Sequence, residues 1–169
     1  MTIKWMSYPR STEVSDTGRK IIEIFESALP AIGSDHANLK SNEVLSVISK
    51  ELESSNFKVE GADPISPKIN IPVLYGENGK IEKSYDVDAY NADEQYRIEV
   101  EAGAGVSNNR FLVDLIKACT LPNIDNVCIA VRQDYKGAKD FKRVNSVIES
   151  IYVSDRLNLP LTEVLILGY

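Results

Sequence analysis

Two short segments of alternating side chains constrain this sequence more than any other feature. The first segment runs from Asp86 to Tyr90 and the second from Tyr96 to Glu101. Successive side chains of a β-strand point to opposite faces, so each segment places its charged residues on one face and its apolar residues mainly on the other. The residues between them, from Asn91 to Glu94, are typical of a turn. The sequence therefore predicts a β-hairpin with one highly charged face.

A turn centred within this loop would bring four carboxylates together. Asp88 would lie opposite Glu99, and Asp86 opposite Glu101, with the facing Cβ atoms about 4.5–5.5 Å apart. Like charges at that spacing destabilise a sheet. A divalent cation resolves the repulsion, because Mg²⁺ and Ca²⁺ bind clustered oxygen atoms. The pattern thus predicts a metal site, and the alternative interpretation is the solvated polar face of an amphipathic hairpin.

Apolar periodicity and turn residues predict the remaining elements. The expected helices are Asp16 to Leu29, Leu39 to Ser54, Ser107 to Cys119 and Lys139 to Leu157. The expected strands are Phe57 to Glu60, Ile69 to Tyr75, Lys80 to Tyr90, Tyr96 to Glu101, Asn126 to Val131 and Leu161 to Leu167. Antiparallel hairpins precede a crossover helix in this order, which favours an α/β fold with a central mixed β-sheet flanked by helices. The length of 169 residues suits a single domain over residues 1–169.

Composition narrows the class of protein. The hydrophobic share of 43% and the charged share of 26% are ordinary for a globular chain. The first residues lack the apolar core of a signal peptide, and no apolar run reaches the roughly 18–20 residues that span a membrane. Cys119 and Cys128 lie in apolar segments without further Cys or His at metal-binding spacing, so we expect buried thiols. These features favour a cytoplasmic protein without a membrane partner.

The net charge of −6 weighs against tight non-specific binding of nucleic acid. Basic residues nevertheless gather late in the chain, at Arg132, Lys136, Lys139, Lys142 and Arg143. They could contact phosphates, or they could form the solvated start of an amphipathic helix, and both interpretations stand. A second polar segment suited to phosphates or base edges comprises Asn108, Asn109 and Arg110. Its alternative is an ordinary helix N-terminus capped by Ser107.

The carboxylate pattern and the order of elements resemble those of the PD-(D/E)XK nuclease superfamily, and of type II restriction endonucleases in particular. The family core of helix, three antiparallel strands, helix and strand (αβββαβ) corresponds here to residues 39–131. Asp88 matches the first acidic residue of the motif, and Glu99-Val100-Glu101 matches the (D/E)-x-K segment. Glu101 replaces the motif lysine, as glutamate does in some restriction enzymes. The resemblance implies a restriction-endonuclease-like fold.

The same resemblance implies a Mg²⁺-dependent endodeoxyribonuclease, with Mn²⁺ able to replace Mg²⁺. Asp88, Glu99 and the Val100 carbonyl would bind the metal, which would lower the pKa of a bound water and offset charge on the phosphate. Glu101 would orient or deprotonate that water. Glu43, on the helix before the sheet, would hold a second metal or an outer-shell water, although a first-turn carboxylate also favours the helix dipole. The substrate would be double-stranded DNA, cut by a homodimer.

The missing lysine leaves the source of positive charge open. A second metal is one candidate, and Lys117 or Arg110 on the following helix is another. Arg97 shares the carboxylate face and is interpreted as part of a structural ion pair, while Asp86 competes for any of the metal-binding roles. The alternative function is a non-catalytic protein of the nuclease fold that binds DNA or a protein partner.

Overall fold

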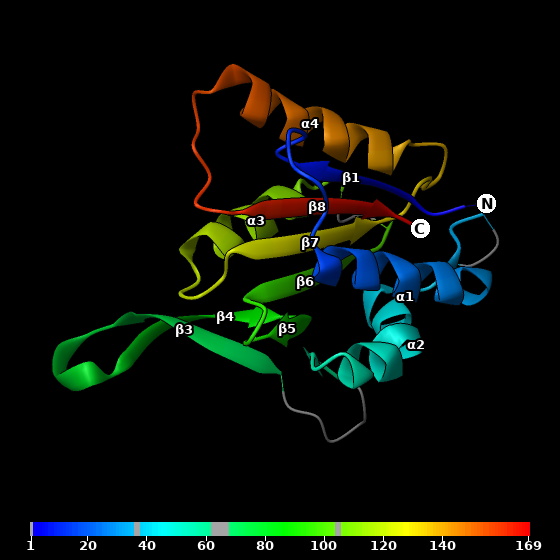
Figure 1. The fold of residues 1–169 in the computed structure, drawn as a ribbon. Helices are drawn as coiled ribbons and strands as arrows, with labels where there is room; N and C mark the ends of the chain where they lie inside the picture. The colour runs from blue at the N-terminus through cyan, green and yellow to red at the C-terminus, as the bar shows by residue number, and fades with distance from the viewer. Residues whose placement is uncertain (1, 36–37, 62–67, 104–105) are drawn as a thin grey trace.

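A six-stranded sheet forms the centre of the protein, as seen in a computed structural model that describes residues 2–35, 38–61, 68–103 and 106–169. Helices cover both faces of this sheet (Figure 1). Its strands are β1 (Lys4–Tyr8), β2 (Lys58–Val59), β5 (Ala89–Asn91), β6 (Tyr96–Glu101), β7 (Asn126–Val131) and β8 (Glu163–Gly168). The α-helices within the described ranges are α1 (Asp16–Ile32), α2 (Ser41–Ser54), α3 (Arg110–Thr120) and α4 (Asp140–Ser154).

The central sheet is mixed. Strands β6, β7 and β8 run parallel, whereas β1, β5 and β2 each pair antiparallel with a neighbour. The order across the sheet is β1-β8-β7-β6-β5-β2. This arrangement confirms the predicted α/β class with a mixed central sheet flanked by helices. The edge strand β1 is an addition that periodicity does not predict, because only its last two residues, Ser7 and Tyr8, are buried.

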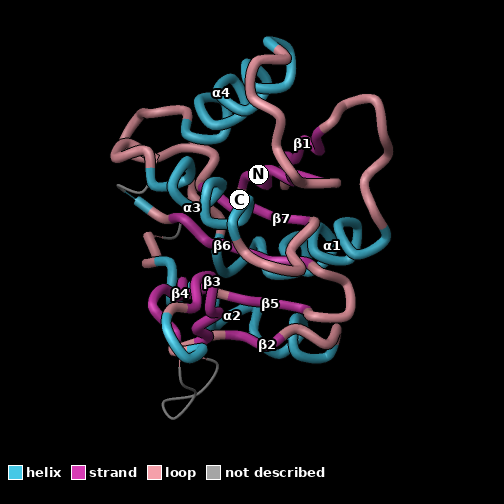
Figure 2. Tube along the Cα trace, turned by 90° about the vertical axis from the view of Figure 1, so that its left-hand side faces the viewer, coloured by secondary structure: helices cyan, strands magenta, loops and turns pink. Residues whose placement is uncertain are grey.

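Two apolar cores lie on the two faces of the sheet. Along β7, Cys128 and Ala130 belong to the core beneath α1 and α2, whereas Val127 and Ile129 belong to the core beneath α3 and α4. Figure 2 shows α1 and α3 on opposite sides of β6 and β7. A parallel strand covered on both faces is expected to be almost continuously apolar. This accounts for the short apolar segments that were predicted as buried strands.

The strand predicted from Lys80 to Tyr90 is divided at Asp88. Its first part is β4 (Ile81–Val87), and its second part is β5. In an unbroken strand Val87 and Ala89 would point to the same face, but Val87 packs in the core beneath α3 and α4, whereas Ala89 packs in the core beneath α1 and α2. The bend at Asp88 therefore resets the alternation of side chains.

The bend sends the first half of this segment out of the main sheet. Strand β4 pairs only with β3 (Ile69–Tyr75), and a short 3₁₀ turn, η1 (Glu77–Gly79), joins the two strands. The resulting two-stranded arm extends past the edge of the molecule in Figure 1. Its base packs Ile69 and Ile71 against the core beneath α3 and α4. The arm therefore begins beside the carboxylate face of β6 and ends in solvent.

Two other sequence expectations concern the cysteines and the membrane. Cys128 is buried and Cys119 is half-buried, and both are free thiols. None of the helices in the described ranges is long and apolar enough to cross a membrane.

Glu163 at the start of β8 joins three other elements through one buried carboxylate. Its Oε1 accepts hydrogen bonds from Ser7 Oγ and Ser15 N, each at 3.0 Å. Its Oε2 accepts from Ser15 Oγ at 2.7 Å and from Tyr96 OH at 2.8 Å. Ser15 Oγ in turn accepts from Gly18 N and caps α1. Since each donor would be costly to bury without an acceptor, this carboxylate fixes β1 and α1 onto the sheet.

We expect Glu163→Ala to lower the free energy of unfolding by about 3–5 kcal/mol, because it leaves several buried donors without an acceptor. Urea unfolding followed by circular dichroism measures this loss. Glu149→Ala is the matched control, since Glu149 is half-exposed and pairs with Arg10 at 2.5 Å on the surface. That variant should stay within about 1 kcal/mol of wild type. Equal losses in both variants would contradict the role given to Glu163.

Candidate functional site

A polar cavity of about 350 Å³ lies where the carboxyl end of β6 meets the start of α2, the first half of α3 and the base of the arm. The predicted residues Asp88, Glu99, Val100, Glu101 and Arg110 all line it. It is also lined by Ser41, Asn42, Glu60, Lys68, Asp86, Asp114 and Lys117. The structure thus brings most of the predicted metal-binding residues together in one place.

Asp88 reaches the cavity because it occupies the bend between β4 and β5. The register of β5 on β6, with Ala89 opposite Ile98, places Asp88 next to Glu99 as predicted. Its Oδ2 accepts a hydrogen bond of 2.8 Å from Val100 N. Burial raises the pKa of Asp88 to about 6, and the hydrogen bond from Val100 opposes that rise. This hydrogen bond therefore holds the carboxylate through Oδ2, and the other oxygen, Oδ1, remains for a ligand.

Glu99 balances the charge of a buried arginine. Arg97 is fully buried, and its Nε donates a hydrogen bond of 2.6 Å to Glu99 Oε1. Its Nη2 donates to the same oxygen. Burial raises the pKa of Glu99, and the guanidinium of Arg97 acts in the opposite direction. The predicted structural ion pair of Arg97 is confirmed, and its Nη1 is buried without a hydrogen-bond partner among the described residues.

Asp114 on α3 is a cavity residue that the sequence analysis missed. It is only 4% exposed, and its Oδ1 accepts from Lys117 Nζ at 3.1 Å. The signal in the sequence is its position on the buried face of the helix, which it shares with Phe111, Leu115 and Ala118. A carboxylate in an otherwise apolar helical stripe indicates a polar partner on the facing element.

Glu101 is the partner of Asp114. Burial and the neighbouring Asp114 carboxylate together raise the pKa of Glu101 to about 8. Arg110 Nε lies 3.8 Å from Glu101 Oε1 and opposes that rise. Two carboxyl groups can hydrogen-bond to each other only when one of them carries a proton.

Both basic residues considered as substitutes for the motif lysine line the cavity. Lys117 is about three-quarters buried and reaches Asp114, whereas the side chain of Arg110 is 70% exposed beside Glu101. Lys117 therefore provides a fixed positive charge inside the cavity. Arg110 provides a second, solvent-exposed positive charge at the margin of the cavity.

Two of the predicted carboxylates are placed differently. The prediction that Asp86 lies opposite Glu101 is wrong, because the chain bends at Asp88 and Asp86 pairs with Asn70 across the arm. Asp86 still lines the cavity, where its carboxylate accepts from Asn70 Nδ2 at 2.8 Å and from Lys68 Nζ at 3.3 Å. Glu43 does not line the cavity, and its Oε2 instead accepts from Lys40 N at 2.6 Å at the start of α2.

Three of the basic residues predicted late in the chain to contact nucleic acid, Arg132, Lys136 and Lys139, do not line this cavity. Arg132 is buried, and its Nη1 donates to Asn38 Oδ1 at 2.7 Å. Lys136 Nζ lies 5.3 Å from the ring centre of Tyr135. Lys139 Nζ lies 2.5 Å from Asp134 Oδ1. Of this group, Arg132 and Lys136 border a separate cavity of about 330 Å³.

The other polar segment leads directly into α3. Asn108 is exposed, and Asn109 occupies the N-cap position of the helix in the left-handed region with a φ of 57°, without a capping hydrogen bond from its side chain. The N-cap position is therefore Asn109 rather than the predicted Ser107, and α3 begins three residues later than predicted. Asn109 Oδ1 accepts from Arg143 Nη2 at 3.2 Å. Arg110, the first residue of the helix, lines the carboxylate cavity.

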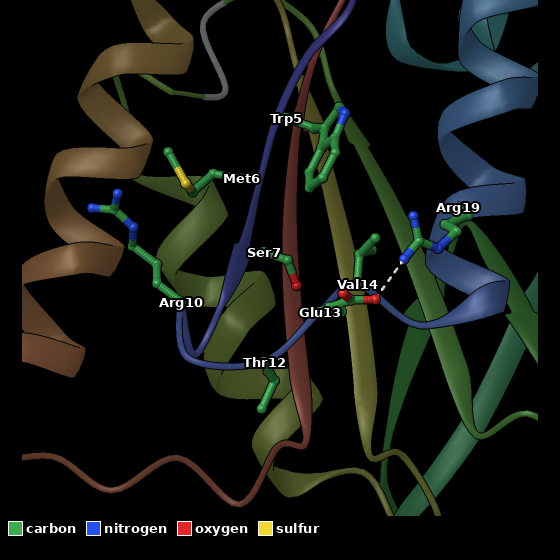
Figure 3. Close-up of a pocket in the computed structure, with 8 residues that line it drawn as sticks. All are labelled: Trp5, Met6, Ser7, Arg10, Thr12, Glu13, Val14 and Arg19. Atoms are coloured by element: carbon green, nitrogen blue, oxygen red, sulfur yellow. Dashed lines mark hydrogen bonds and ion pairs between the residues drawn. The ribbon is translucent and has the colours of Figure 1, made fainter.

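A further cavity of about 330 Å³ lies along the outer edge of β1 (Figure 3). Arg10 and Met6 lie on the α4 side of the strand, and Trp5 and Arg19 lie on the α1 side. Both arginines are paired, Arg10 with Glu149 and Arg19 with Glu13. Since its charged groups already have partners, this cavity offers less chemistry than the carboxylate cavity.

Sequence comparisons do not assign this chain to a family. No model of a known protein family matches it, and no curated protein matches it. The basis for a functional assignment is therefore the set of groups in the carboxylate cavity. These groups combine four buried or nearly buried carboxylates with three basic side chains, those of Lys68, Arg110 and Lys117.

The donor set suits a hydrated hard cation. Within the described ranges, no three carboxylate, thiol or imidazole side chains converge as in a closed metal site. Mg²⁺, however, usually binds one or two carboxylates and completes its shell with water and substrate phosphates. Asp114 Oδ2 is buried and has no hydrogen-bond partner among the described residues. A pair of these carboxylates, completed by water and phosphate oxygens, is therefore the arrangement that suits Mg²⁺ here.

The raised pKa of Glu101 predicts that stability depends on pH in the absence of metal. Because the folded protein holds a proton that the unfolded chain releases, stability should fall as pH rises from about 4.5 to about 8. Glu101→Gln removes this proton and should reduce the fall by on the order of 1–3 kcal/mol. Urea unfolding between pH 5 and 9 in EDTA measures both curves. Parallel curves for wild type and variant would contradict the assignment.

Proposed function

We propose that this protein is a divalent-metal-dependent endonuclease that hydrolyses phosphodiester bonds of double-stranded DNA. The observation that carries the proposal is one cavity that contains Asp88, Glu99 and Glu101 together with Lys117 and Arg110. Carboxylates of this kind hold Mg²⁺ or Mn²⁺, and basic side chains beside them attract phosphate. The succession of helix α2, antiparallel strands, helix α3 and strand β7, with Asp88 at the bend before β5 and Glu99 and Glu101 on β6, supports a restriction-endonuclease-like fold.

The individual residues would have separate tasks. Asp88 and Glu99 would hold the metal together with the Val100 carbonyl, Glu99 through its second oxygen while Arg97 fixes its orientation. A metal bound there would lower the pKa of a water and offset charge on the phosphate. Glu101 would orient the attacking water or accept its proton, a role that requires the ionised carboxylate, and the positive charge of a nearby metal ion would favour that form. Lys117 and Arg110 would contact the phosphate.

The proposed substrate follows from the rim of the cavity. Arg110 is exposed at this rim and offers charge to a phosphate backbone, and the exposed Asn108 precedes it by two residues. The acidic total charge of −6 requires such contacts to be local. Two copies related by a two-fold axis would present one site to each strand of a duplex. We therefore include a homodimer in the proposal.

We expect Asp88→Asn and Glu99→Gln each to reduce cleavage of supercoiled plasmid DNA in Mg²⁺ or Mn²⁺ by roughly 10²-fold or more. Glu43→Gln is the matched control, because Glu43 caps α2 and does not line the cavity. That variant should cleave at the wild-type rate. Circular dichroism checks that all three variants are folded. Wild-type cleavage by Asp88→Asn would remove this residue from the site.

The second candidate is a non-catalytic protein of the nuclease fold that binds DNA or a protein partner. It is favoured by Glu101 in place of the motif lysine and by the acidic total charge. A protein that uses metal should gain thermal stability as Mn²⁺ or Mg²⁺ fills its site. No cleavage and no metal-linked stabilisation would together favour this second candidate.

A further inference from the structure

Asp114 carries a buried oxygen without a partner. The residue is 4% exposed on the inner face of α3, and it lines the carboxylate cavity. Its Oδ1 accepts from Lys117 Nζ at 3.1 Å and lies 4.0 Å from Arg97 Nη2. Among the residues that the structure describes, no donor reaches its Oδ2. Such an atom is costly to bury unless it meets a proton or a cation.

Glu101, on the facing strand β6, makes it more costly to bury the unpaired oxygen of Asp114. Glu101 lines the same cavity and is itself 9% exposed, so its negative charge faces that of Asp114 in a largely buried space. Neither carboxylate can donate while both are ionised. The nearest basic groups only partly offset the repulsion. Arg97 bonds to Glu99, and Arg110 lies 3.8 Å from Glu101 with a side chain that is 70% exposed.

If position 114 had a purely structural role, an apolar residue would suit it better than aspartate. The other buried positions of α3 include Phe111, Leu115 and Ala118, which pack in the core. Replacing buried charges by well-packed apolar residues is often neutral or stabilising. The carboxylate of Asp114 therefore fits a ligand-binding role better than a role in holding α3 to the sheet.

We propose that Glu101 and Asp114 form a subsite for a divalent cation, which adds α3 to the metal-binding elements of the cavity. The inference rests on the proposed metal-dependent function of the same cavity, and it replaces Glu43 with Asp114 as the additional acidic ligand. One oxygen of Asp114 is held by Lys117, which orients the carboxylate and leaves Oδ2 to the cation. The remaining ligands would be water or substrate phosphate, as is usual for Mg²⁺.

The test measures Mn²⁺ binding and thermal stability in the complete chain. Free Mn²⁺ is counted by electron paramagnetic resonance, and the unfolding midpoint is recorded with and without Mn²⁺. Asp114→Asn keeps the size of the side chain and can donate a hydrogen bond to Glu101, so the metal-free variant should remain folded. Loss of an outer-shell partner alone costs about 10–100-fold in metal affinity. We expect Asp114→Asn to weaken Mn²⁺ binding at least about tenfold and to reduce the Mn²⁺-induced rise of the midpoint.

Asp140→Asn is the matched control. Asp140 is 3% exposed at the start of α4 and does not line the carboxylate cavity. This variant should keep the wild-type affinity for Mn²⁺ and the wild-type rise of the midpoint, whatever its own effect on basal stability.

The results of these measurements test the metal subsite and the nuclease activity independently of each other. Equal Mn²⁺ affinity in wild type and Asp114→Asn would overturn the subsite, and so would a wild-type protein that binds no Mn²⁺. Metal-dependent plasmid cleavage in either case would leave the nuclease proposal standing. Conversely, Mn²⁺ binding that requires Asp114 without any cleavage would support the subsite and remove the nuclease.

Discussion

A guanidinium buried inside the sheet must be balanced by carboxylates, and the arrangement of the cavity follows from that requirement. Arg97 is fully buried on β6, with Glu99 as its hydrogen-bonded partner and Asp114 4.0 Å away. Burying an unpaired charge would cost several kcal/mol, so β6 and α3 are held together by opposite charges as well as by apolar packing. The negative charges exceed the positive ones once Asp88 and Glu101 are included. This excess is what makes the cavity attractive to a cation.

The bend at Asp88 gives the cavity its second side. A straight strand would have kept Asp86 and Asp88 on one face of one sheet. Instead, the main sheet keeps β5, and β4 departs with β3 as an arm. Asp88 stays beside Glu99, while Lys68 and Asp86 border the same space from the base of the arm. The cavity is therefore enclosed by two sheets and two helices rather than by the single hairpin that the sequence suggests.

Local patterns predicted the features that depend on local geometry. The alternation along β6 placed Arg97, Glu99 and Glu101 on one face, and the register of the turn placed Asp88 beside Glu99. Strand pairing over long distances has no such local signal, so the bend at Asp88 and the edge strand β1 were missed. Asp114 was missed for a different reason. The role of Asp114 depends on the side chains of the facing strand, whereas helical periodicity identifies it only as a polar residue in an apolar stripe.

The position of β8 in the sheet has a consequence for how the protein is made. Strand β8 lies between β1 and β7, and Ser7 and Glu163, which are bonded to each other, are separated by 156 positions in the chain. During translation, β1 emerges early and has no strand to pair with until β8 leaves the ribosome. Its polar backbone and the exposed Trp5 remain accessible to other chains throughout that interval. Pairing of β1 in the main sheet is thus delayed until β8 has been made, and its edge stays open to other chains until then.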